Sequence, residues 1–497
     1  MVGGAKRPWC ELERKAVPPG MKAVVIGGGL GGLATALRLR ARGWQVVVCD
    51  ANPTLGGKMN RFARDCLVFD TGPSLITMPH VFRELYTAVG EHLEDHVSFM
   101  PVRPFADYHF SSGAHVLCPA GIDEWRSVVG ELEPRDVRGV DRLYEVGRKV
   151  YELSARTFFR RSPLSPPSLR ELMAFRFLPL RDAWGNYART VERHIRNPLL
   201  RMIYLRYATY VGSSPYCCPA TLLVIPYIEQ AFGAWHVQGG LYSIVESLAR
   251  LAADRGVELR TSARVAAIER NPQRATGVRL ADGNCIVADA VVMNGDSAAT
   301  AELLDRKVEI DAASRSMSGV VLLCRASQSN LRAHHTVFFS ADYAAEFDQL
   351  TVERKFPEDP TVYISAPRVT DETASSGFFA MANAPAIAKP WSGRDVELAI
   401  DAVRRRLDTA GIHLNREDVL DVWHPGRFAQ AYLAPYGSIY GANSHGWRNA
   451  FLRTPNRSRD LRGLYFVGGS SHPGGGTPTV LLSAGITAGL VDGDARA

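Results

Sequence analysis

The sequence lacks any uninterrupted apolar run of about 18 residues, the length that a membrane-spanning helix requires. Residues 1–20 also lack the apolar core of a secretory signal, so they are predicted to be a disordered leader. Both absences argue against a spanning segment, and any membrane contact is therefore expected to be peripheral.

Cysteine is present without the spacing that would give it a structural role. None of the eight Cys forms a CxxC pair, and no Cys/His cluster has the spacing of zinc ligands. We therefore predict no metal site and no disulfide framework. A reducing, cytoplasmic setting fits this usage best.

Acidic residues are scarce in one part of the chain. The net charge is +7, yet residues 156–206 alone hold eleven Arg and no Lys against three acids. No recognised nucleic-acid motif accompanies this segment, so nucleic acid is not expected as a partner. An anionic membrane surface is the other explanation for such a patch.

A nucleotide-binding pattern opens the fold. Residues 21–26 form a short β-branched run, residues 34–41 are helix formers, and residues 45–49 form a second apolar run that ends at Asp50. The turn between the first run and the helix reads Gly27, Gly28, Gly29, Leu30, Gly31, Gly32. Strand, glycine-rich turn, helix, strand and acid follow one another within the ~30 residues that dinucleotide binding requires.

Each glycine of this turn has a predicted role. Gly27 permits the tight turn, Gly29 lets the backbone approach a pyrophosphate, and Gly32 lets helix and strand pack closely. Asp50 would accept hydrogen bonds from the adenosine ribose. The paired Gly56-Gly57 with Lys58 is typical of a second phosphate contact in flavoproteins, although this unit alone leaves FAD and NAD open.

The far end of the chain has a second glycine block. Residues 464–469 read as a buried strand that ends on Gly468 and Gly469, and HPGGGTP follows at residues 472–478. Pro478 suits the first turn of a helix through the apolar run 479–490. The unpaired N–H groups of that turn are suited to an anion or to the negative charge of a reduced flavin. Cofactor loops at both ends imply a discontinuous domain.

The middle of the chain is predicted to return to the same sheet. Its expected elements are a helix over 241–255, strands over 257–260 and 264–268, a hairpin around 281–283 and a strand over 288–296.

Three blocks of motifs resemble one family, the bacterial carotenoid desaturases. They are the GGGLGGL turn with Asp50, Gly56-Gly57-Lys58 and Asp70-Thr71-Gly72-Pro73-Ser74; then YATYVGSSPYCCPA at 207–220 and Gln238 to Tyr242; and finally HPGGGTP. The resemblance spans nearly the whole chain after Met21. YATYVGSSP and residues 453–458 look closest to the hydroxyneurosporene-desaturase branch.

The resemblance implies an FAD-dependent oxidoreductase that removes hydrogen from a carotenoid and extends its conjugation. It implies an α/β fold of the amine-oxidase-like flavoprotein type, with a Rossmann-like FAD-binding domain, a substrate-binding sheet domain and a helical lid. Asp50 departs from the commoner Glu. The residues expected to bind FAD are Gly27, Gly29, Gly31, Gly32, Asp50, Gly57, Lys58, Gly72, Pro73, Ser74, Val265 (through its backbone, to the adenine), Gly468, Gly469, Gly475 and Thr477.

Domain boundaries follow from this assignment. We expect residues 21–105, 230–300 and 415–497 to form the FAD-binding domain. Residues 106–149 and 301–414 would form the substrate-binding domain, and residues 150–229 the lid and membrane-contact region.

No catalytic residue can be named from the sequence. Hydride loss from a polyene leaves a cation that conjugation stabilises, so no strong protein base is demanded. His472 is interpreted as structural, His334-His335 as a loop or strand pair, and Tyr436 and Tyr440 as tunnel-lining or core residues. The alternatives are a redox-neutral carotenoid isomerase, another oxidase of the same fold, and a non-catalytic prenyl-binding escort protein, which the intact glycine blocks disfavour.

The segment from Tyr151 to Leu200 is predicted to dock on a bilayer, because a polyene is almost absent from water. The alternative is a helical lid whose aromatic residues pack inward and whose arginines face solvent, and both hold if the outer rim of the lid is the membrane face. The segment interleaves aromatic residues with arginines, and prolines break it into short pieces. The interleaved residues are Phe158, Phe159, Phe175, Phe177, Trp184 and Tyr187 with Arg160, Arg161, Arg170, Arg176 and Arg181.

Overall fold

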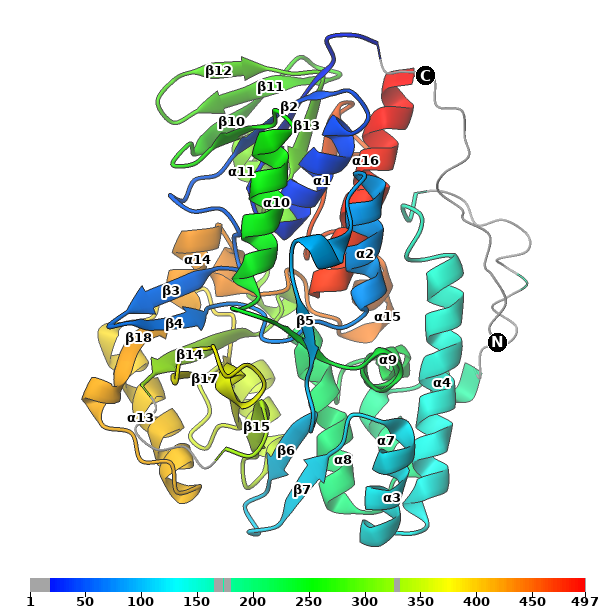
Figure 1. The fold of residues 1–497 in the computed structure, drawn as a ribbon, viewed down its shortest axis with the longest axis vertical. Coiled ribbons are helices and arrows are strands. Elements are labelled where there is room, and N and C mark those ends of the chain that lie inside the picture. Colours follow the sequence, from blue (N-terminus) through cyan, green and yellow to red (C-terminus); the bar gives the residue numbers. More distant parts are fainter. Residues whose placement is uncertain (1–17, 165–172, 174–179, 326–330, 497) are drawn as a thin grey trace.

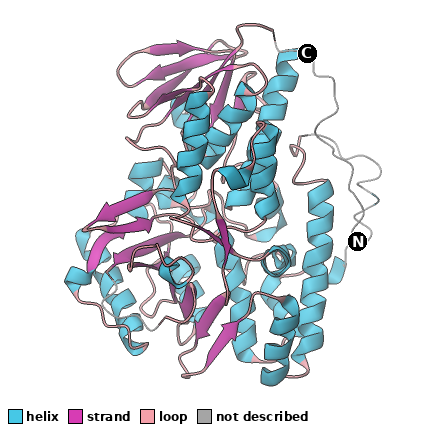
Figure 2. Cartoon of the chain, in the orientation of Figure 1, coloured by secondary structure: helices cyan, strands magenta, loops and turns pink. Residues whose placement is uncertain are grey.

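The computed structural model describes residues 18–164, 173, 180–325 and 331–496 (Figure 1). Residues 1–17 of the predicted leader lie outside this range. Figure 2 shows helices and strands intermixed along the whole molecule, as an α/β fold requires. None of the helices in the described ranges is both long enough and apolar enough to cross a membrane.

A five-stranded parallel sheet forms the upper part of Figure 1. Its central strands are almost fully buried, which agrees with their unbroken runs of Val, Ile and Ala. In spatial order the strands are β19 (Leu464–Phe466), β13 (Ala290–Met293), β1 (Lys22–Ile26), β2 (Gln45–Cys49) and β9 (Glu258–Arg260). Segments far apart in the sequence therefore lie side by side in one sheet.

Helices cover one face of this sheet and a small antiparallel sheet covers the other. The helices are α1 (Leu30–Arg40), α2 (Pro79–Ala88), α10 (Tyr242–Asp254) and α16 (Thr477–Arg496), and they share one apolar core with β1 and β2. The small sheet consists of β10 (Val265–Arg270), β11 (Ala275–Leu280) and β12 (Cys285–Val287), and α11 (Thr300–Leu303) packs beside it.

A seven-stranded sheet forms the second layer, mostly antiparallel, with one parallel pair between β6 and β15. In spatial order its strands are β18 (Val419–Trp423), β14 (Ser318–Cys324), β17 (Phe378–Ala384), β16 (Val362–Ser365), β15 (His335–Phe338), β6 (Ala106–His109) and β7 (His115–Cys118). The predicted boundary at residue 415 would place β18 with the first sheet, but the backbone of β18 pairs with β14. Residues 419–423 therefore pack with the second sheet.

Helices enclose the end of this second sheet that carries β6 and β7, and they share a core with it. They are α3 (Ile122–Leu132), α4 (Asp136–Arg156), α6 (Leu180–Ala183), α7 (Tyr187–His194), α8 (Pro198–Arg206) and α9 (Val224–Phe232), with the 3₁₀ turns η3 (Tyr207–Val211) and η4 (Ala220–Leu223). The helical region therefore begins at Ile122 and not at residue 150, because α3 and α4 pack together ahead of the remaining helices.

The remaining elements connect these layers. They are β3 (Arg61–Arg64), β4 (Leu67–Asp70), β5 (Phe99–Pro101), β8 (Trp235–Val237), α12 (Tyr343–Asp348), α13 (Gly393–Thr409), α14 (Pro425–Tyr432) and α15 (Gly446–Phe451). Asp70, at the end of β4, accepts backbone N–H bonds from Leu241 (2.7 Å) and Tyr242 (3.1 Å). This contact ties the small hairpin to the start of α10 and explains the acid in the Asp70-Thr71-Gly72 motif.

Candidate functional site

One cavity of about 620 Å³ runs between the two sheets and the helical region. This volume lies within the ~300–1,000 Å³ range of ligand sites. Of the fifteen residues expected to bind FAD, every one except Gly32 lines the cavity. The two glycine blocks, which lie at opposite ends of the chain, therefore meet around the same space.

The geometry of the first glycine turn explains why its residues are glycines. Gly27 has φ +99°, a conformation that residues with a Cβ rarely adopt. A Cβ on Gly32 would lie 2.1 Å from the carbonyl oxygen of Gly27. Gly27 and Gly32 thus have the turn and packing roles predicted for them, and the amide of Asn294 holds the turn by donating to Gly27 O at 2.9 Å.

Gly29 is less tightly enclosed than Gly32, because a Cβ there would approach a side-chain amide and not a backbone carbonyl oxygen. The nearest atom to a Cβ on Gly29 would be the Asn294 amide nitrogen, at 3.2 Å. Gly29 is the N-cap of α1 and provides no capping side chain, so the first-turn N–H groups of α1 are left for a ligand. Gly29 also pairs with Gly56 across an isolated bridge, which brings the second glycine pair to the same wall.

Asp50 follows β2 and lines the cavity. One carboxylate oxygen accepts the backbone N–H of Gly28 at 2.7 Å, and the other accepts that of Asn52 at 2.8 Å. The carboxylate thus holds the glycine turn in place through the Gly28 N–H. Oδ1 also accepts from the Asn52 side-chain amide at 3.2 Å, so Oδ2, which accepts from Gly28, is the oxygen with a lone pair left for a ribose hydroxyl, and the ribose contact stays a prediction.

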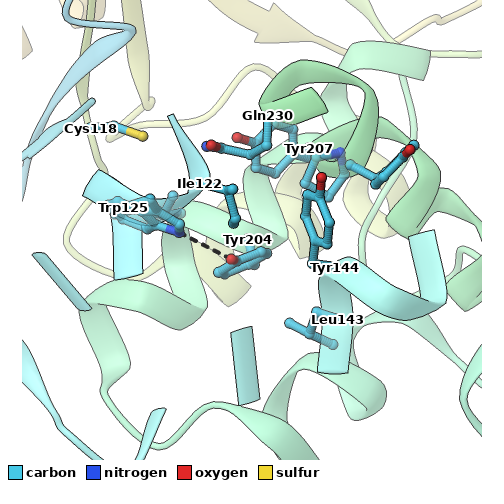
Figure 3. A pocket seen from close by; sticks show the side chains of 11 residues that line it. Cys118, Ile122, Trp125, Leu143, Tyr144, Tyr204, Tyr207 and Gln230 are labelled. Carbon is cyan, nitrogen blue, oxygen red and sulfur yellow. Dashed lines mark hydrogen bonds between the residues drawn. The ribbon is translucent and has the colours of Figure 1, made fainter. Parts of the chain in front are cut away.

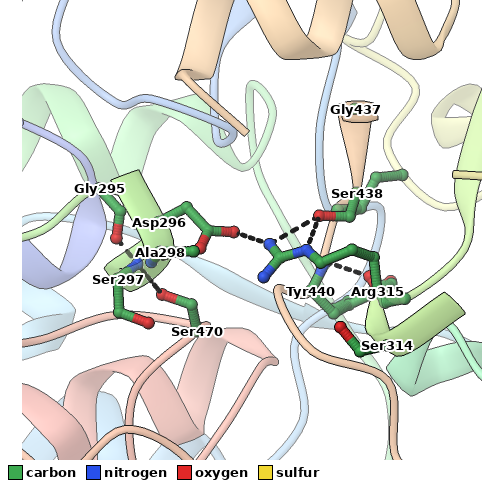
Figure 4. A network of polar contacts seen from close by, with 12 residues as sticks. Gly295, Asp296, Ser297, Ala298, Ser314, Arg315, Gly437, Ser438, Tyr440 and Ser470 are labelled. Carbon is green, nitrogen blue, oxygen red and sulfur yellow. Dashed lines mark hydrogen bonds and ion pairs between the residues drawn. The ribbon is translucent and has the colours of Figure 1, made fainter. Parts of the chain in front are cut away.

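Buried cations gather near the glycine blocks, where Figure 4 shows part of their network. Arg315 forms an ion pair with Asp296 and donates to the hydroxyl of Ser438 at 2.8 Å. Lys58 and Arg453 line the cavity close by, and burial lowers their pKa values, to about 8 and about 10 respectively. Three cations therefore share a single acid, an arrangement that suits an anionic ligand such as the diphosphate of FAD.

The cavity continues away from the glycine blocks along an apolar wall. Its residues come from the lid helices and from the second sheet: Val150, Leu222, Val224, Ile225, Ile228, Val321, Phe379 and Met381. Polar residues interrupt this wall, among them Arg206, Tyr210, Glu229 and Tyr363. We refer to these four residues as the distal polar cluster.

Two of the histidines considered in the sequence analysis, His472 and His335, are buried and make hydrogen bonds within the protein. His472 is buried and its Nε2 bonds to the carbonyl oxygen of Phe158 at 2.7 Å, while burial lowers its pKa to about 4. His335 belongs to β15, and its Nδ1 bonds to Tyr363 at 2.7 Å. Within the described ranges no cluster of three or more potential ligands could hold a metal ion.

The two tyrosines differ in location. Tyr440 lines the cavity, and a Cβ on Gly475 would lie 2.8 Å from its ring. Tyr436 is absent from the cavity wall and donates to Ile310 O at 2.7 Å. Only Tyr440 is therefore positioned to touch a ligand.

The residues of the predicted membrane segment lie in different environments. Phe158 and Phe159 line the cavity, and the Phe158 ring packs on His472 with centroids 4.4 Å apart. Tyr187 is fully buried, whereas Trp184, Arg160, Arg161 and Arg181 are exposed. The remaining residues of that prediction, Phe175, Phe177, Arg170 and Arg176, lie outside the described ranges.

A second hollow between β7, α3, α4 and α9 is shown in Figure 3. Its volume of about 10 Å³ is roughly the space of one water molecule. The tyrosine hydroxyl of Tyr204 accepts from Trp125 at 3.2 Å on its wall. This hollow is a packing defect and not a ligand site.

Several residues of the site were not found from the sequence. Asn294 and Asp296 follow β13 at the carboxyl edge of the parallel sheet, where ligands of such sheets bind. Their position after this strand could have identified them as site residues from the sequence. Arg206 and Glu229 carry no such signal, because only the folded chain brings α8 and α9 to the cavity.

Comparisons with known proteins agree with this geometry. The family model for flavin containing amine oxidoreductase matches residues 30–492. The chain is 32% identical to 4,4'-diapolycopene oxygenase of Methylomonas sp (93% of this chain, 96% of the relative) and 32% identical to hydroxyneurosporene desaturase of Rubrivivax gelatinosus (94% and 92%). The structure of an oxidoreductase from Methanosarcina mazei shares the fold, with a TM-score of 0.58, 17% identity and coverage of 93% of this chain and 99% of that one.

These findings confirm the predicted fold class and the predicted cofactor. The cation cluster and the glycine cradle fit FAD, and the family match covers both glycine blocks except for the first three glycines of the turn. The chain belongs to the family of flavin-containing amine oxidoreductases and is an FAD-dependent oxidoreductase.

Proposed function

We propose that the enzyme desaturates a carotenoid, removing one hydrogen from each of two adjacent carbons of the polyene. The observation that carries this proposal is the long apolar wall that continues the FAD cavity towards the second sheet. A wall of this kind fits a polyene chain, and the relatives named above bear carotenoid names.

The cofactor residues are proposed in the following roles. Gly27, Gly29, Gly31 and the pair Gly56-Gly57 would surround the FAD diphosphate, with Asp50 at the ribose and the Val265 backbone at the adenine. Residues 468–477 would lie against the flavin, with the first turn of α16 facing it. Gly72, Pro73 and Ser74 would complete that wall.

Bound FAD would supply the hydride acceptor. The chain's own contribution is to hold the polyene along the apolar wall and to keep water from it. Buried Lys58 and Arg453 would stabilise added negative charge at the cofactor end, because little water is present to screen it.

The test is expression in cells that make defined acyclic carotenoids. The pigments are separated by chromatography, and their masses are measured by mass spectrometry. A desaturase gives a product that has lost two hydrogens and absorbs at longer wavelength. A product of unchanged mass would indicate an isomerase, and a product with added oxygen would indicate an oxygenase. Either of these two results would overturn the proposal.

We further propose that the enzyme collects its substrate from a membrane at the place where α15 borders the cavity. Phe451 lines the cavity, and its ring centroid lies 5.8 Å from that of Phe158 and 6.0 Å from that of Trp184. Trp184, Trp447 and Leu452 are exposed around it. Apolar side chains at this rim could enter the acyl boundary while nearby arginines remain with phosphates.

Co-sedimentation with anionic liposomes tests this docking surface. The double variant Trp447→Ser, Leu452→Ser should lose most of the binding, whereas the control Val287→Ser, on distant β12, should retain it. Failure of the native protein to sediment at low salt, or equal binding by the double variant, would contradict the proposal.

A further inference from the structure

A row of three buried histidines leads from the cavity wall into the protein. Its members are His335, the first residue of β15, His334 immediately before it, and His236 on β8, and each is at most 2% exposed. The ring centroids of His335 and His334 are 4.5 Å apart, and those of His334 and His236 are 5.0 Å apart. We refer to these three residues as the histidine row.

The phenol of Tyr363 joins the row to the cavity. His335 pairs with Ser365 across β15 and β16, and Tyr363, two residues before Ser365, lies on the same face of the sheet. The Tyr363 hydroxyl bonds to His335 Nδ1 at 2.7 Å and to Ser74 Oγ at 2.6 Å. Tyr363 and Ser74 both line the cavity. A proton that reaches the Tyr363 oxygen from a ligand therefore has a hydrogen-bonded route to His335.

The carboxylate of Asp371, in the loop between β16 and β17, stands at the other end of the row. His236 Nε2 lies 3.8 Å from a carboxylate oxygen of Asp371. Burial disfavours the charge of this carboxylate, but hydrogen bonds from Thr373 and from the Gly239 N–H outweigh it and lower the pKa of Asp371. Gly239 and Glu372 are exposed, so the row ends next to the protein surface.

The fold leaves most ring nitrogens of the histidine row unused. Among the described residues, His335 Nε2, His334 Nε2 and both ring nitrogens of His236 are buried and have no hydrogen-bond partner. Buried polar atoms without partners destabilise a protein, so packing alone does not account for three histidines here. Burial lowers the pKa values of all three, to about 3 for His334 and about 4 for His236. A proton passed along the row is therefore not retained at neutral pH.

We propose that the histidine row carries away the proton that the carotenoid loses during desaturation, with Tyr363 as the group that accepts it. This inference rests on the proposed function. Loss of a hydride to bound FAD leaves a polyene cation. The adjacent C–H bond then breaks, and its electron pair forms the new double bond. Its proton passes to the Tyr363 oxygen while the Tyr363 proton passes to His335 Nδ1.

The remaining steps only move a proton. Tyr363 ends as the neutral phenol, and His335 becomes an imidazolium that gives up its Nε2 proton to His334. His236 and then Asp371 receive the proton, and Asp371 releases it to solvent. Weak bases suffice, because the proton beside a delocalised cation is strongly acidic. A path through buried rings also removes the proton without admitting water, which would add to the cation.

The acids of the cavity wall are otherwise engaged. Asp296 is paired with Arg315, and Asp50 accepts backbone N–H groups of the glycine turn. Burial raises the pKa of Glu229 to about 8, so this carboxyl already holds a proton at neutral pH. Tyr363 differs from all three because a second group accepts its own proton as a new one arrives.

Single-turnover kinetics test the relay. The FAD-loaded protein is mixed without oxygen with the acyclic carotenoid that the expression test shows to be desaturated, held in detergent micelles, and the loss of flavin absorbance and the growth of the longer polyene are followed. Tyr363→Phe should lower the rate about 100-fold, the lower end of general-base effects. Asp371→Asn keeps the shape of the side chain but not its basicity. It should lower the rate and make it more sensitive to replacement of H₂O by D₂O, because proton release then limits the rate.

The matched control is Asp136→Asn on α4. Asp136 is fully buried and accepts the backbone N–H groups of Arg196 and Asn197, each at 2.8 Å, so the variant also removes a buried carboxylate. Its rate and its sensitivity to D₂O should equal those of the native protein. A native rate in Tyr363→Phe would overturn the inference. So would a lower rate in Asp371→Asn with native sensitivity to D₂O, because that result indicates a structural role.

A second measurement needs no carotenoid. Protein with ¹⁵N-labelled histidine is transferred to D₂O, and exchange of the His335 N–H is followed by NMR, with His335→Gln identifying the signal. Exchange should be fast in the native protein and in Asp136→Asn despite burial, because the row connects His335 to solvent. Asp371→Asn should lose this fast exchange. Equal protection of the His335 N–H in native protein and Asp371→Asn would overturn the inference.

The relay and the proposed function fail in distinguishable ways. Fast exchange that depends on Asp371, without loss of hydrogen from any carotenoid, would leave the proton path intact and overturn desaturation. Desaturation at the native rate in Tyr363→Phe and Asp371→Asn would do the reverse.

Discussion

Near the glycine blocks, the buried Arg315 has a carboxylate partner in Asp296 and a hydroxyl partner in Ser438. In the distal cluster, the guanidinium of the buried Arg206 bonds to the Tyr210 hydroxyl and lies over the Tyr210 and Tyr363 rings, and burial keeps the Glu229 carboxyl protonated. Both arginines are 9% exposed, so the difference lies in their partners and not in burial.

This difference separates a cation that maintains the structure from one that is available to a ligand. A paired buried arginine completes its own hydrogen bonds within the fold. An unpaired buried arginine lowers the stability of the fold, and a bound ligand that accepts its hydrogen bonds offsets that cost. The four predictions that follow test this contrast, starting with the largest expected effect.

The largest effect is expected at the glycine end. Gly29→Val should abolish FAD binding, because a side chain there enters the space that the diphosphate needs and its Cβ would also press on the Asn294 amide at 3.2 Å. The flavin absorbance of the purified protein, relative to protein concentration, measures this loss.

The matched control is Gly489→Val on α16, where a Cβ would meet no atom within 4 Å. It should purify with full flavin. Full flavin in Gly29→Val would show that this turn does not hold the cofactor, and an unfolded variant would be recognised by its circular dichroism.

This first prediction could be made from sequence because the glycine end is built from local motifs. Gly27, Gly32 and Asp50 lie within one strand–turn–helix–strand unit, so their spacing alone places them at the same turn and predicts a role for each. The distal cluster depends on packing between α8, α9 and the second sheet, which no spacing records. Composition likewise could not show that Phe158 and Phe159 line the cavity.

The second prediction removes the carboxylate partner of Arg315, so that this buried arginine also lacks an ion pair with Asp296. Asp296→Asn leaves Arg315 buried without its carboxylate, and this should lower the free energy of unfolding by about 3–5 kcal/mol. Urea denaturation measures the change.

An exposed pair serves as the control for Asp296→Asn. Glu269→Gln breaks the ion pair with Arg279, whose side chains are 42% and 51% exposed, and should cost less than about 1 kcal/mol. Equal losses in the two variants would mean that the Asp296 pair does not behave as a buried one.

The third prediction concerns the pH dependence of stability at the distal end. The pKa of Glu229 is raised by burial to about 8, so its protonated form is favoured in the folded state. The resulting stability is fully present below the ordinary pKa of 4.5 and is lost as pH rises through about 8. Relative to Glu229→Gln, the native protein should therefore lose a few kcal/mol of stability (order of magnitude) between pH 5 and 9.

Urea denaturation at a series of pH values tests this dependence, with the exposed Glu131→Gln as the control. The other titratable groups that sense Glu229 are buried tyrosines, a cysteine and Arg206. Burial raises the pKa values of Tyr108, Cys118, Tyr187, Tyr204, Tyr207, Tyr210 and Tyr363, and Arg206 stays charged. They keep one charge state across this range. A constant difference between native protein and Glu229→Gln at every pH would contradict the buried, protonated carboxyl.

The smallest effect distinguishes the two tyrosines that donate to Glu229. Each hydroxyl stabilises the ionised carboxylate and so lowers its pKa, and the contribution of Tyr207 exceeds that of Tyr210. Tyr207→Phe and Tyr210→Phe should each cost about 1 kcal/mol and raise the pKa of Glu229 further, Tyr207→Phe by more. The infrared band of the protonated carboxyl, with Glu229→Gln as the blank, reports the pH at which the proton leaves. Tyr210→Phe also removes the hydroxyl that accepts from Arg206, so its cost should exceed that of a variant that loses the bond to Glu229 alone. If both variants shifted the pH of proton loss equally, the Tyr207 hydroxyl would not be the stronger partner of Glu229.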